Sequence, residues 1–208
     1  MIISLIGFMG CGKSSVGRRL SELLCCRFMD LDEEIENTAG RSIPEIFATE
    51  GEAGFRQKEL QALQKIVNEF PSHPEFQCHP ELQCHPELQC HPELQCHPEF
   101  QCHPERSEGS PHLILALGGG TVLTPQCAES VHKNTVCIYI RASVDTLLEH
   151  LASEAEERPL LARNTELRSR IENLLSQRTA IYENTAHIVV DTDNKTIEQI
   201  AYEISTLI

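Results

Sequence analysis

A glycine-rich stretch near the start of the chain reads Gly7-Phe8-Met9-Gly10-Cys11-Gly12-Lys13-Ser14. It matches the phosphate-loop pattern G-x-x-x-x-G-K-[ST]. The apolar run of residues 2–6 precedes it as a strand, and residues 13–24 follow it with the spacing of a helix. The alternative is a glycine-rich turn without a ligand, but this stretch has the strand–loop–helix context that a phosphate site requires. It therefore predicts an α/β fold built around a phosphate-binding loop.

The residue types of this loop suit the phosphates of ATP together with a magnesium ion. Glycines allow backbone N–H groups to turn toward phosphate oxygens. The Lys13 ammonium offers positive charge to the β and γ phosphates, and the Ser14 hydroxyl is a ligand for Mg²⁺. The ATP-binding residues predicted here are Gly10, Cys11, Gly12, Lys13, Ser14 and Ser15.

The rest of the chain alternates short apolar runs with amphipathic stretches, which is typical of βα units around a parallel sheet. Five strands are expected, at residues 2–6, 27–31, 113–117, 135–140 and 188–191. Helices are expected at residues 13–24, 43–48, 54–70, 143–152 and 167–182, with one more at the carboxyl terminus. The 208 residues, 40% of them hydrophobic, suit one compact domain over residues 1–208.

A hexapeptide repeat interrupts this pattern. Between His73 and Glu105 the sequence His-Pro-Glu-Leu/Phe-Gln-Cys runs five times and begins a sixth. Proline in every repeat excludes a continuous helix and a central strand. Residues 73–111 are therefore expected to form an extended, mostly disordered insertion within the single domain.

Three roles are open for the insertion. Adjacent cysteine and histidine side chains suggest metal binding, but their six-residue period does not match the ligand spacing of structural zinc sites. A tolerated linker is the preferred interpretation, because long surface loops add only slowly to the entropy of loop closure. Recognition of a partner is the third.

Charge and composition restrict the partners of the chain. The 31 acidic and 17 basic side chains give a formal net charge of -14, which disfavours a nucleic-acid partner. No apolar run reaches the roughly 18 residues that cross a bilayer, and the first residues lack the features of a signal peptide. We therefore expect no membrane partner and a cytoplasmic location. Five of the ten cysteines belong to the repeat, and reduced thiols are expected.

Two carboxylates, Asp30 and Asp32, follow the second predicted strand. Ligands of open parallel sheets collect at the carboxyl ends of the strands, and the alternation of a strand puts both carboxylates on one face. One of them is suited to hold Mg²⁺ through water, and the other to orient or deprotonate an acceptor hydroxyl. The alternative is that one of them caps the acidic helix that follows.

A third candidate cluster surrounds Arg56, near the start of a predicted helix. Its guanidinium offers paired donors to a small carboxylate, and the rings of Phe47 and Phe55 are suited to wall a cyclic substrate. Glu59, three residues further on, would hold the guanidinium in place. A surface salt bridge beside core aromatic residues is the alternative interpretation.

Three further features lie in the second half of the chain. Gly118-Gly119-Gly120 ends a predicted strand, where glycine lets the backbone approach a ligand closely; a plain flexible turn is the alternative. Arg158 lies in a charged, proline-broken stretch typical of a mobile lid, where it is suited to neutralise a transferring phosphoryl group. Arg178, four residues before Tyr182, is a second candidate for binding a substrate carboxylate.

Taken together and in this order, the motifs resemble those of the shikimate kinases. They are the phosphate loop, Asp-x-Asp, Gly-Glu-x-x-Phe-Arg, Gly-Gly-Gly, Arg-Pro-Leu-Leu and Arg-x-x-x-Tyr, spread over nearly the whole chain apart from the insertion. The resemblance implies a three-layer α/β/α P-loop kinase fold with a five-stranded parallel sheet. It also implies transfer of the γ-phosphoryl group of MgATP to the 3-hydroxyl of shikimate. We expect a monomer whose partners are shikimate and ATP.

The resemblance also implies roles for individual residues. The shikimate ligands that it implies are Asp32, Arg56, Gly118, Gly119, Gly120 and Arg178. The catalytic residues are Lys13, Asp32 and Arg158, of which Arg158 also contacts ATP. The magnesium ligands are Ser14 and Asp30. Phe47, Phe55 and Glu59 match substrate-pocket positions less decisively.

Two features depart from the family pattern. Leu151, with His150 beside it, stands where the family often has an arginine that stacks on adenine. The insertion falls where the family has a short connection, directly before the strand that leads into the glycine triplet. A disturbed register of that strand would damage the site.

Two other functions stay open at this point. Another small-metabolite P-loop kinase, such as a gluconate kinase, would share Lys13 and Ser14 but would not need Arg56 and Arg178 to bind a cyclic acid. The second is a metal-binding repeat protein on a vestigial kinase core, which the intact motifs argue against. The expected mechanism is direct in-line transfer, because no cysteine or histidine takes the place of a nucleophile within the motifs.

Overall fold

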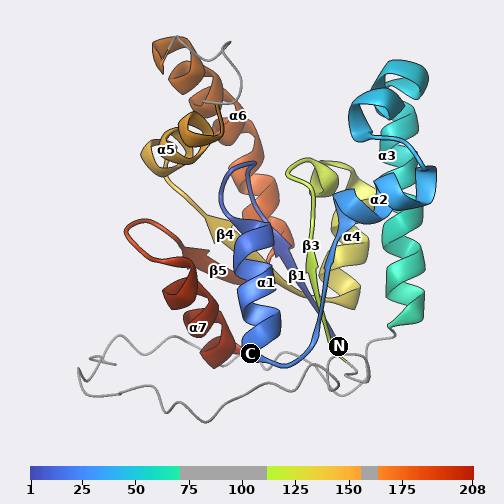
Figure 1. The fold of residues 1–208 in the computed structure, drawn as a ribbon, viewed down its shortest axis with the longest axis horizontal. Coiled ribbons are helices and arrows are strands. Elements are labelled where there is room, and N and C mark those ends of the chain that lie inside the picture. The colour runs from blue at the N-terminus through green and yellow to red at the C-terminus, as the bar shows by residue number, and fades with distance from the viewer. Residues whose placement is uncertain (71–111, 156–163) are drawn as a thin grey trace.

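The computed structural model describes residues 1–70, 112–155 and 164–208, except for the side chains of residues 152–155 and 164–166. The strands of this part are β1 (Ile2–Ile6), β2 (Arg27–Asp30), β3 (Leu113–Ala116), β4 (Val136–Arg141) and β5 (Ile188–Asp191). They form one sheet in the order β2-β3-β1-β4-β5, and every pairing is parallel (Figure 1). The five-stranded parallel sheet predicted from the sequence is confirmed.

Helices cover both faces of this sheet (Figure 1). They are α1 (Lys13–Leu23), α2 (Leu31–Ala39), α3 (Ile43–Glu69), α4 (Pro125–Asn134), α5 (Val144–Ala155), α6 (Asn164–Thr185) and α7 (Ile197–Leu207), with a 3₁₀ turn η2 (Thr121–Leu123). Helices α1 and α7 pack together on one face, and α3 and α4 lie on the other. The result is the predicted three-layer α/β/α arrangement.

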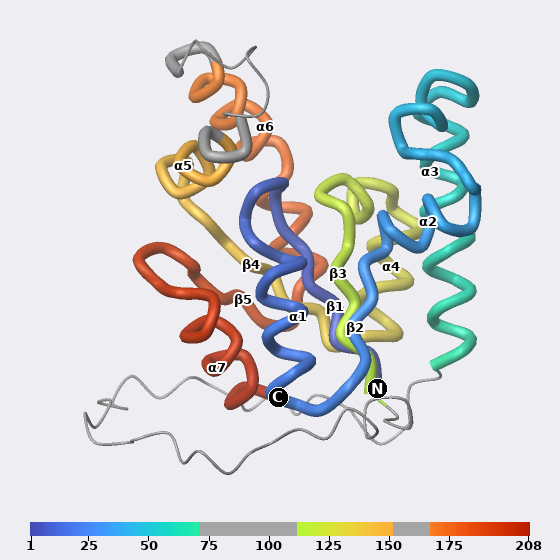
Figure 2. The backbone as a smooth tube through the Cα atoms, in the orientation of Figure 1, coloured from blue at the N-terminus to red at the C-terminus, as the bar shows by residue number. Residues whose placement is uncertain are grey.

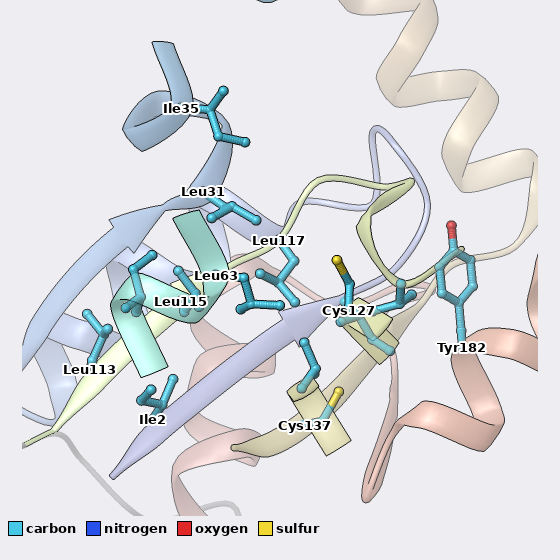
Figure 3. Close-up of a cluster of buried hydrophobic side chains, with 14 of the residues drawn as sticks. Ile2, Leu31, Ile35, Leu63, Leu113, Leu115, Leu117, Cys127, Cys137 and Tyr182 are labelled. Atoms are coloured by element: carbon cyan, nitrogen blue, oxygen red, sulfur yellow. The ribbon is translucent and has the colours of Figure 1, made fainter. Parts of the chain in front are cut away.

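Each face of the sheet has its own hydrophobic core. Ile2 and Leu115 belong to the core under α3 and α4, which Figure 3 shows in close-up. Ile3 and Ile114, each adjacent in sequence to one of these residues, belong to the core under α1 and α7. Central strands covered on both faces are buried at every position, and β1 and β3 have this pattern.

The helices predicted at residues 43–48 and 54–70 form one element, α3, that is interrupted at Gly51. The backbone there has φ 69° and ψ −174°, which is not helical and favours glycine. The interruption brings Phe47, before it, against Phe55, after it, with ring centroids 4.6 Å apart. The expected pair of phenylalanine rings beside Arg56 thus depends on the interruption of helix α3 at Gly51.

Helix α4 has no counterpart among the predicted elements. It begins at Pro125, and proline is favoured in the first turn of a helix. It packs the buried side chains of Cys127 and Val131 into the core. Only two of its side chains are fully buried, so its apolar pattern is weak in the sequence.

The insertion lies outside the described residues, but both of its attachment points are described. The Arg27 guanidinium lies 5.3 Å from the centroid of the Phe70 ring, and Arg27 pairs with Leu113 in the sheet. The two attachment points are therefore close together, at the end of the sheet opposite the phosphate loop (Figure 2). Strand β3 pairs in continuous register with β1 and β2, so the disturbance of register considered from the sequence is not found.

We expect that replacing residues 73–111 by a four-residue glycine–serine linker preserves both fold and activity. The attachment points are already close, and each halving of loop length changes the closure free energy by only about 0.6 kcal/mol. Circular dichroism on heating and an ADP-release assay would measure the outcome. A chain with the repeat scrambled at constant composition is the control. Loss of activity in the shortened chain alone would show that the repeat serves the enzyme.

Two expectations about the chain concern membranes and thiols. Among the residues that the structure describes, no helix combines the length and apolar character needed to span a membrane. The cysteines of the same part are free thiols, as predicted, and are Cys11, Cys25, Cys26, Cys127 and Cys137.

Candidate active site

The carboxyl ends of three neighbouring strands bring the predicted motifs to one end of the sheet (Figure 2). Strand β1 leads into the phosphate loop, β2 ends at Asp30, and β3 leads into the glycine turn, residues 118–120. Helices α5 and α6 rise on one side of this end, and α2 and α3 on the other. Loops at this edge are where open parallel sheets bind their ligands.

The phosphate loop caps the amino terminus of α1. Gly10 and Gly12 have φ of 77° and 87°, a left-handed conformation that lets neighbouring N–H groups point to one side. The Lys13 ammonium donates hydrogen bonds to the carbonyl oxygens of Gly7 (3.1 Å) and Phe8 (2.9 Å). The loop thus combines a lysine and the positive end of a helix dipole, which suits an anionic ligand.

Two oxygen ligands suited to magnesium meet where β2 faces α1. The Ser14 hydroxyl donates to Asp30 Oδ2 at 2.6 Å. Hydroxyl and carboxylate oxygens are the hard ligands that Mg²⁺ prefers, and this ion usually takes only one or two protein ligands beside water and phosphate. The pair predicted from the sequence therefore fits a magnesium ion.

Asp32 lies in the first turn of helix α2, not on a strand. Strand β2 ends at Asp30, which caps α2 by accepting a hydrogen bond from the Asp32 N–H at 3.0 Å. The argument that strand alternation places both carboxylates on one face is therefore wrong, and the capping alternative is correct for Asp30. A short polar side chain before a helix is a preferred cap, which ends the strand one residue earlier than expected.

The Asp32 carboxyl group is held in an environment that disfavours its charge. Burial, with the negative charges of Asp30 and Glu59, raises the pKa of Asp32 to about 6, against the opposing influence of Lys13. Its Oδ1 atom is buried, and no hydrogen-bond partner reaches it within the described part of the chain. A buried carboxylate with a raised pKa and a free oxygen is suited to accept a proton or a hydrogen bond from a substrate hydroxyl.

The glycine turn packs directly against both predicted substrate groups. A Cβ atom at Gly118 would lie 2.8 Å from Asp32 Oδ1, and one at Gly120 would lie 2.7 Å from an Arg56 nitrogen. A side chain at either position would displace the Asp32 carboxylate or the Arg56 guanidinium from its present place. The glycine turn therefore lets the backbone approach both groups closely, as expected from the sequence.

A buried glutamate orients Arg56. Glu59, only 1% exposed, accepts from the Arg56 guanidinium at 2.6 Å and from the Thr121 hydroxyl at 2.7 Å. The Glu59 carboxylate thus links helix α3 to the 3₁₀ turn that follows the glycines. The exposed Glu52 makes a weaker second contact with the guanidinium, at 3.3 Å. Arg56 is held by a buried partner and is not part of an ordinary surface salt bridge.

We expect Glu59→Gln to raise KM for the acceptor about tenfold, since a buried hydrogen bond to a charged group contributes on the order of 1.5–3 kcal/mol. The amide keeps the shape of the side chain but not the charge that fixes the guanidinium. Steady-state kinetics with the acceptor varied would measure the effect. Glu52→Gln is the matched control and should change KM less than twofold. Equal effects of the two changes would contradict the role given to Glu59.

Arg178 reaches the site from helix α6. Its guanidinium lies 5.7 Å from the centroid of the Phe8 ring, which belongs to the phosphate loop. One turn later, the Tyr182 hydroxyl donates to the Gly119 carbonyl oxygen at 2.6 Å. Helix α6 therefore borders the phosphate loop and the glycine turn on the side opposite α2 and α3.

A cavity of about 1020 Å³ opens beside the phosphate loop. The loop and the start of α1 form one wall, with Ser15 among its residues, and the first turns of α5 form another. The third wall is the loop between β5 and α7, residues 192–196, where Asp193 accepts from the Ser143 N–H and the Thr146 hydroxyl. This volume lies near the upper end of the usual range of small-molecule sites. It suits a nucleotide whose phosphates lie on the loop.

The loop of residues 192–196 is the part of this cavity that the sequence analysis missed. The sequence does carry its signals: a strand end, Asn194 in a left-handed turn at φ 59°, and Thr196 as the cap of α7 with Gln199. Such a turn is common on protein surfaces, and only its contact with α5 brings it to the nucleotide cavity.

The two residues that depart from the family pattern both lie against Gly10 of the phosphate loop. The His150 ring nitrogen Nδ1 is 2.7 Å from the Gly10 carbonyl oxygen. A Cβ atom at Gly10 would lie 3.0 Å from the Leu151 side chain. Helix α5 is therefore packed on the phosphate loop at this position by an imidazole and a leucine.

All but one of the predicted site residues lie within the described part of the chain. The phosphate loop, Asp30, Asp32, Arg56, the glycine turn and Arg178 are all at the same end of the sheet. Arg158 lies outside the described residues, so its place in the site stays a prediction. The described residues predicted from the sequence thus lie together, and the loop of residues 192–196 was not among them.

Comparisons with known proteins point to one family of kinases. The family model described as shikimate kinase matches residues 9–72 and 97–208. A shikimate kinase of Thermus thermophilus is 33% identical over 202 residues, which cover 97% of this chain and 86% of the relative. One from Dictyoglomus turgidum is 30% identical over 204 residues, covering 97% and 94%.

Solved structures agree with the sequence comparisons. The structure of shikimate kinase from Acinetobacter baumannii in complex with shikimate is 27% identical, with a TM-score of 0.71, and covers 99% of this chain and 91% of that one. Shikimate kinase from Aquifex aeolicus is 26% identical, with a TM-score of 0.67 and coverage of 100% and 95%. With the phosphate loop, the paired aspartates and the glycine turn in place, this chain belongs to the shikimate kinase family.

Proposed function

We propose that this kinase transfers the γ-phosphoryl group of ATP to the 3-hydroxyl of shikimate, giving shikimate 3-phosphate and ADP, through the residues gathered at the carboxyl ends of β1, β2 and β3. The observation that carries the proposal is the packing of one glycine turn against both Asp32 and Arg56. A base for a hydroxyl and a cation for a carboxylate thus border the same space, next to the phosphate loop. A cyclic hydroxy acid requires that combination.

On the acceptor side, Arg56 and Arg178 bind the substrate carboxylate from opposite sides of the site. Planar guanidinium groups offer paired donors that match a carboxylate. Asp32 accepts the hydrogen bond of the reacting hydroxyl and takes its proton as the phosphorus–oxygen bond forms. The backbone of Gly118, Gly119 and Gly120 forms the remaining wall of the pocket.

On the donor side, the phosphate loop holds the ATP phosphates by its backbone N–H groups. Lys13 leaves the carbonyl oxygens that it contacts in this structure and places its charge on the β and γ phosphates. Arg158 is proposed to add a second cation at the transferring group. Positioning and charge neutralisation supply most of the rate in such a transfer, which proceeds in line without a phosphoenzyme.

Ser14 and Asp30 are proposed to hold the magnesium ion that accompanies ATP. When bound, the ion screens the negative charge of the phosphates. The proposal is supported by the 2.6 Å hydrogen bond that places the Ser14 and Asp30 oxygens side by side. The fit rests on this pair and on the chemistry of its oxygens.

We expect shikimate-dependent ADP release to stop when excess EDTA is added and to return when magnesium is restored in excess. Mg²⁺ screens the phosphates and is held by few protein ligands, so it exchanges readily. Asp30→Asn should raise the magnesium concentration needed for half-maximal rate, whereas Asp145→Asn, in the wall of the same cavity, should not. Unchanged magnesium dependence in the Asp30 variant would remove that residue from the ion site.

A coupled ADP-release assay tests the main proposal. Purified protein with MgATP is compared in the presence of shikimate, of gluconate and of no acceptor. We expect release with shikimate only. Release with gluconate alone would assign the chain to another acceptor, and release without any acceptor would indicate an ATPase.

A cytoplasmic monomer is the further part of the proposal. It is supported by the formal net charge of -14, because a net charge far from zero keeps proteins soluble and monomeric. Size-exclusion chromatography with light scattering would measure the mass in solution. A mass near 23.4 kDa is expected.

A further inference from the structure

The side chain of Tyr182 joins helix α6 to the glycine turn, residues 118–120. Its hydroxyl donates a 2.6 Å hydrogen bond to the Gly119 carbonyl oxygen. Tyr182 is 0% exposed, and its ring centroid lies 5.1 Å from that of Tyr139. Figure 3 shows its ring at one end of the core, with the hydroxyl oxygen pointing away from the packed side chains. The buried ring of Tyr182 thus fixes the direction of its hydrogen bond to Gly119.

The carbonyl group that Tyr182 holds lies at the centre of the turn. Its two glycine neighbours border Asp32 and Arg56, as described above. Gly119 itself packs on the phosphate loop, where a Cβ atom would lie 3.1 Å from the Met9 nitrogen. A displacement of Gly119 would therefore move the acceptor wall relative to the phosphate loop.

Helix α6 carries Arg178 one turn before Tyr182, near the Phe8 ring. Tyr182 therefore connects helix α6, which carries Arg178, to the glycine turn, which borders Arg56. Burial raises the pKa of Tyr182 to about 12, although the charge of the nearby Arg178 and its hydrogen bond with the phenol lower it. The phenol is thus protonated at neutral pH and acts as a donor.

We propose that Tyr182 is a positioning residue for phosphoryl transfer: its hydrogen bond to Gly119 holds the acceptor wall in place between Arg178 and the phosphate loop. It acts through the turn and does not touch shikimate. The inference rests on the proposed function, because the positioned groups are those assigned to shikimate. Without the hydroxyl, the partly buried Gly119 carbonyl oxygen loses this donor, and the turn relaxes toward another partner.

The test uses the full chain with Tyr182→Phe, and Tyr139→Phe as the matched control. Both changes remove one hydroxyl from the same pair of packed rings. We expect Tyr182→Phe to lower kcat/KM for shikimate about five- to tenfold, the loss expected for one hydrogen bond of about 1 kcal/mol or slightly more, with KM for ATP changed less than twofold. Tyr139→Phe should leave both within twofold. A second replacement of Tyr182, by 4-aminophenylalanine, keeps a donor at the same place and should restore most of the activity.

Each outcome separates the inference from the function on which it rests. Wild-type protein without shikimate-dependent ADP release overturns both. An active wild type with an unaffected Tyr182→Phe variant overturns only the positioning role. Equal losses in the two phenylalanine variants, or no rescue by the amino analogue, would show that the ring cluster matters for stability and that the contact with Gly119 does not.

Discussion

Lys13→Ala is expected to lower kcat for shikimate-dependent ADP release by about 10²–10³-fold, the usual effect of removing one preorganised donor of charge stabilisation. Lys13 is the cation of the phosphate loop, and its present hydrogen bonds are to two neutral carbonyl oxygens. Phosphate oxygens carry full negative charge, so they attract its ammonium group more strongly. Stopped-flow or steady-state ADP release at saturating ATP and shikimate would measure the loss.

The matched control for this change is Lys195→Ala. Lys195 lines the same cavity, but its ammonium pairs with Glu203 at 2.6 Å. We expect its loss to change kcat less than threefold, since a partly exposed ion pair contributes only about 0.2–1 kcal/mol. A similar loss in both variants would mean that the general charge of the cavity matters more than the position of Lys13.

Asp32→Asn is expected to lower kcat by about 10²–10⁴-fold, the range typical of a general base, with a smaller effect on KM for shikimate. The amide keeps the shape of the side chain and can still hydrogen-bond the hydroxyl, but it cannot take the proton. Its neighbour Glu33, whose exposed carboxylate pairs with Arg18 at 2.7 Å, supplies the control Glu33→Gln. Only the Asp32 change should affect kcat.

The same substitution is expected to stabilise the fold in the absence of nucleotide and metal. The pKa of Asp32 is raised to about 6 by burial and by nearby carboxylates, so the folded protein binds its proton at a higher pH than the unfolded chain does. The stabilising contribution of the protonated form is therefore present at low pH and is lost as pH rises through about 6. At pH 7.5 the variant should melt at a higher temperature than wild type, whereas at pH 4 the difference should vanish. A lower melting temperature of the variant at pH 7.5 would show that the negative charge of Asp32 does not destabilise the folded protein.

The family pattern in the sequence is specific because several motifs each require particular residue types at particular positions. The phosphate loop requires glycines where φ is positive, and Gly10 and Gly12 adopt such angles. At Gly118 and Gly120, the Asp32 carboxylate and the Arg56 guanidinium lie where a side chain would begin. Constraints of this kind leave few residue choices, so they could be recognised from the sequence.

The elements that sequence analysis misjudged differ from the prediction at their boundaries. Asp32 was placed by strand alternation, but the cap at Asp30 starts a helix one residue before it. The predicted break near residues 49–53 became a single non-helical residue, Gly51, inside a continuous element. One helix cap contributes only about 1 kcal/mol to stability. The choice between neighbouring helix boundaries is therefore decided by the packing of the helix.

By itself, the sequence determined the parallel α/β class, the phosphate loop and the kinase family, because each depends on local backbone chemistry and on the order of motifs. Only the tertiary structure decided how Glu59 orients Arg56 and that residues 192–196 line the cavity beside the phosphate loop. It also decided that Tyr182 donates a hydrogen bond to Gly119, which lies 63 positions earlier in the chain. The physical reason is that these contacts join helices and loops across the sheet, and the places of those elements follow from burying two hydrophobic cores and not from any short stretch of chain.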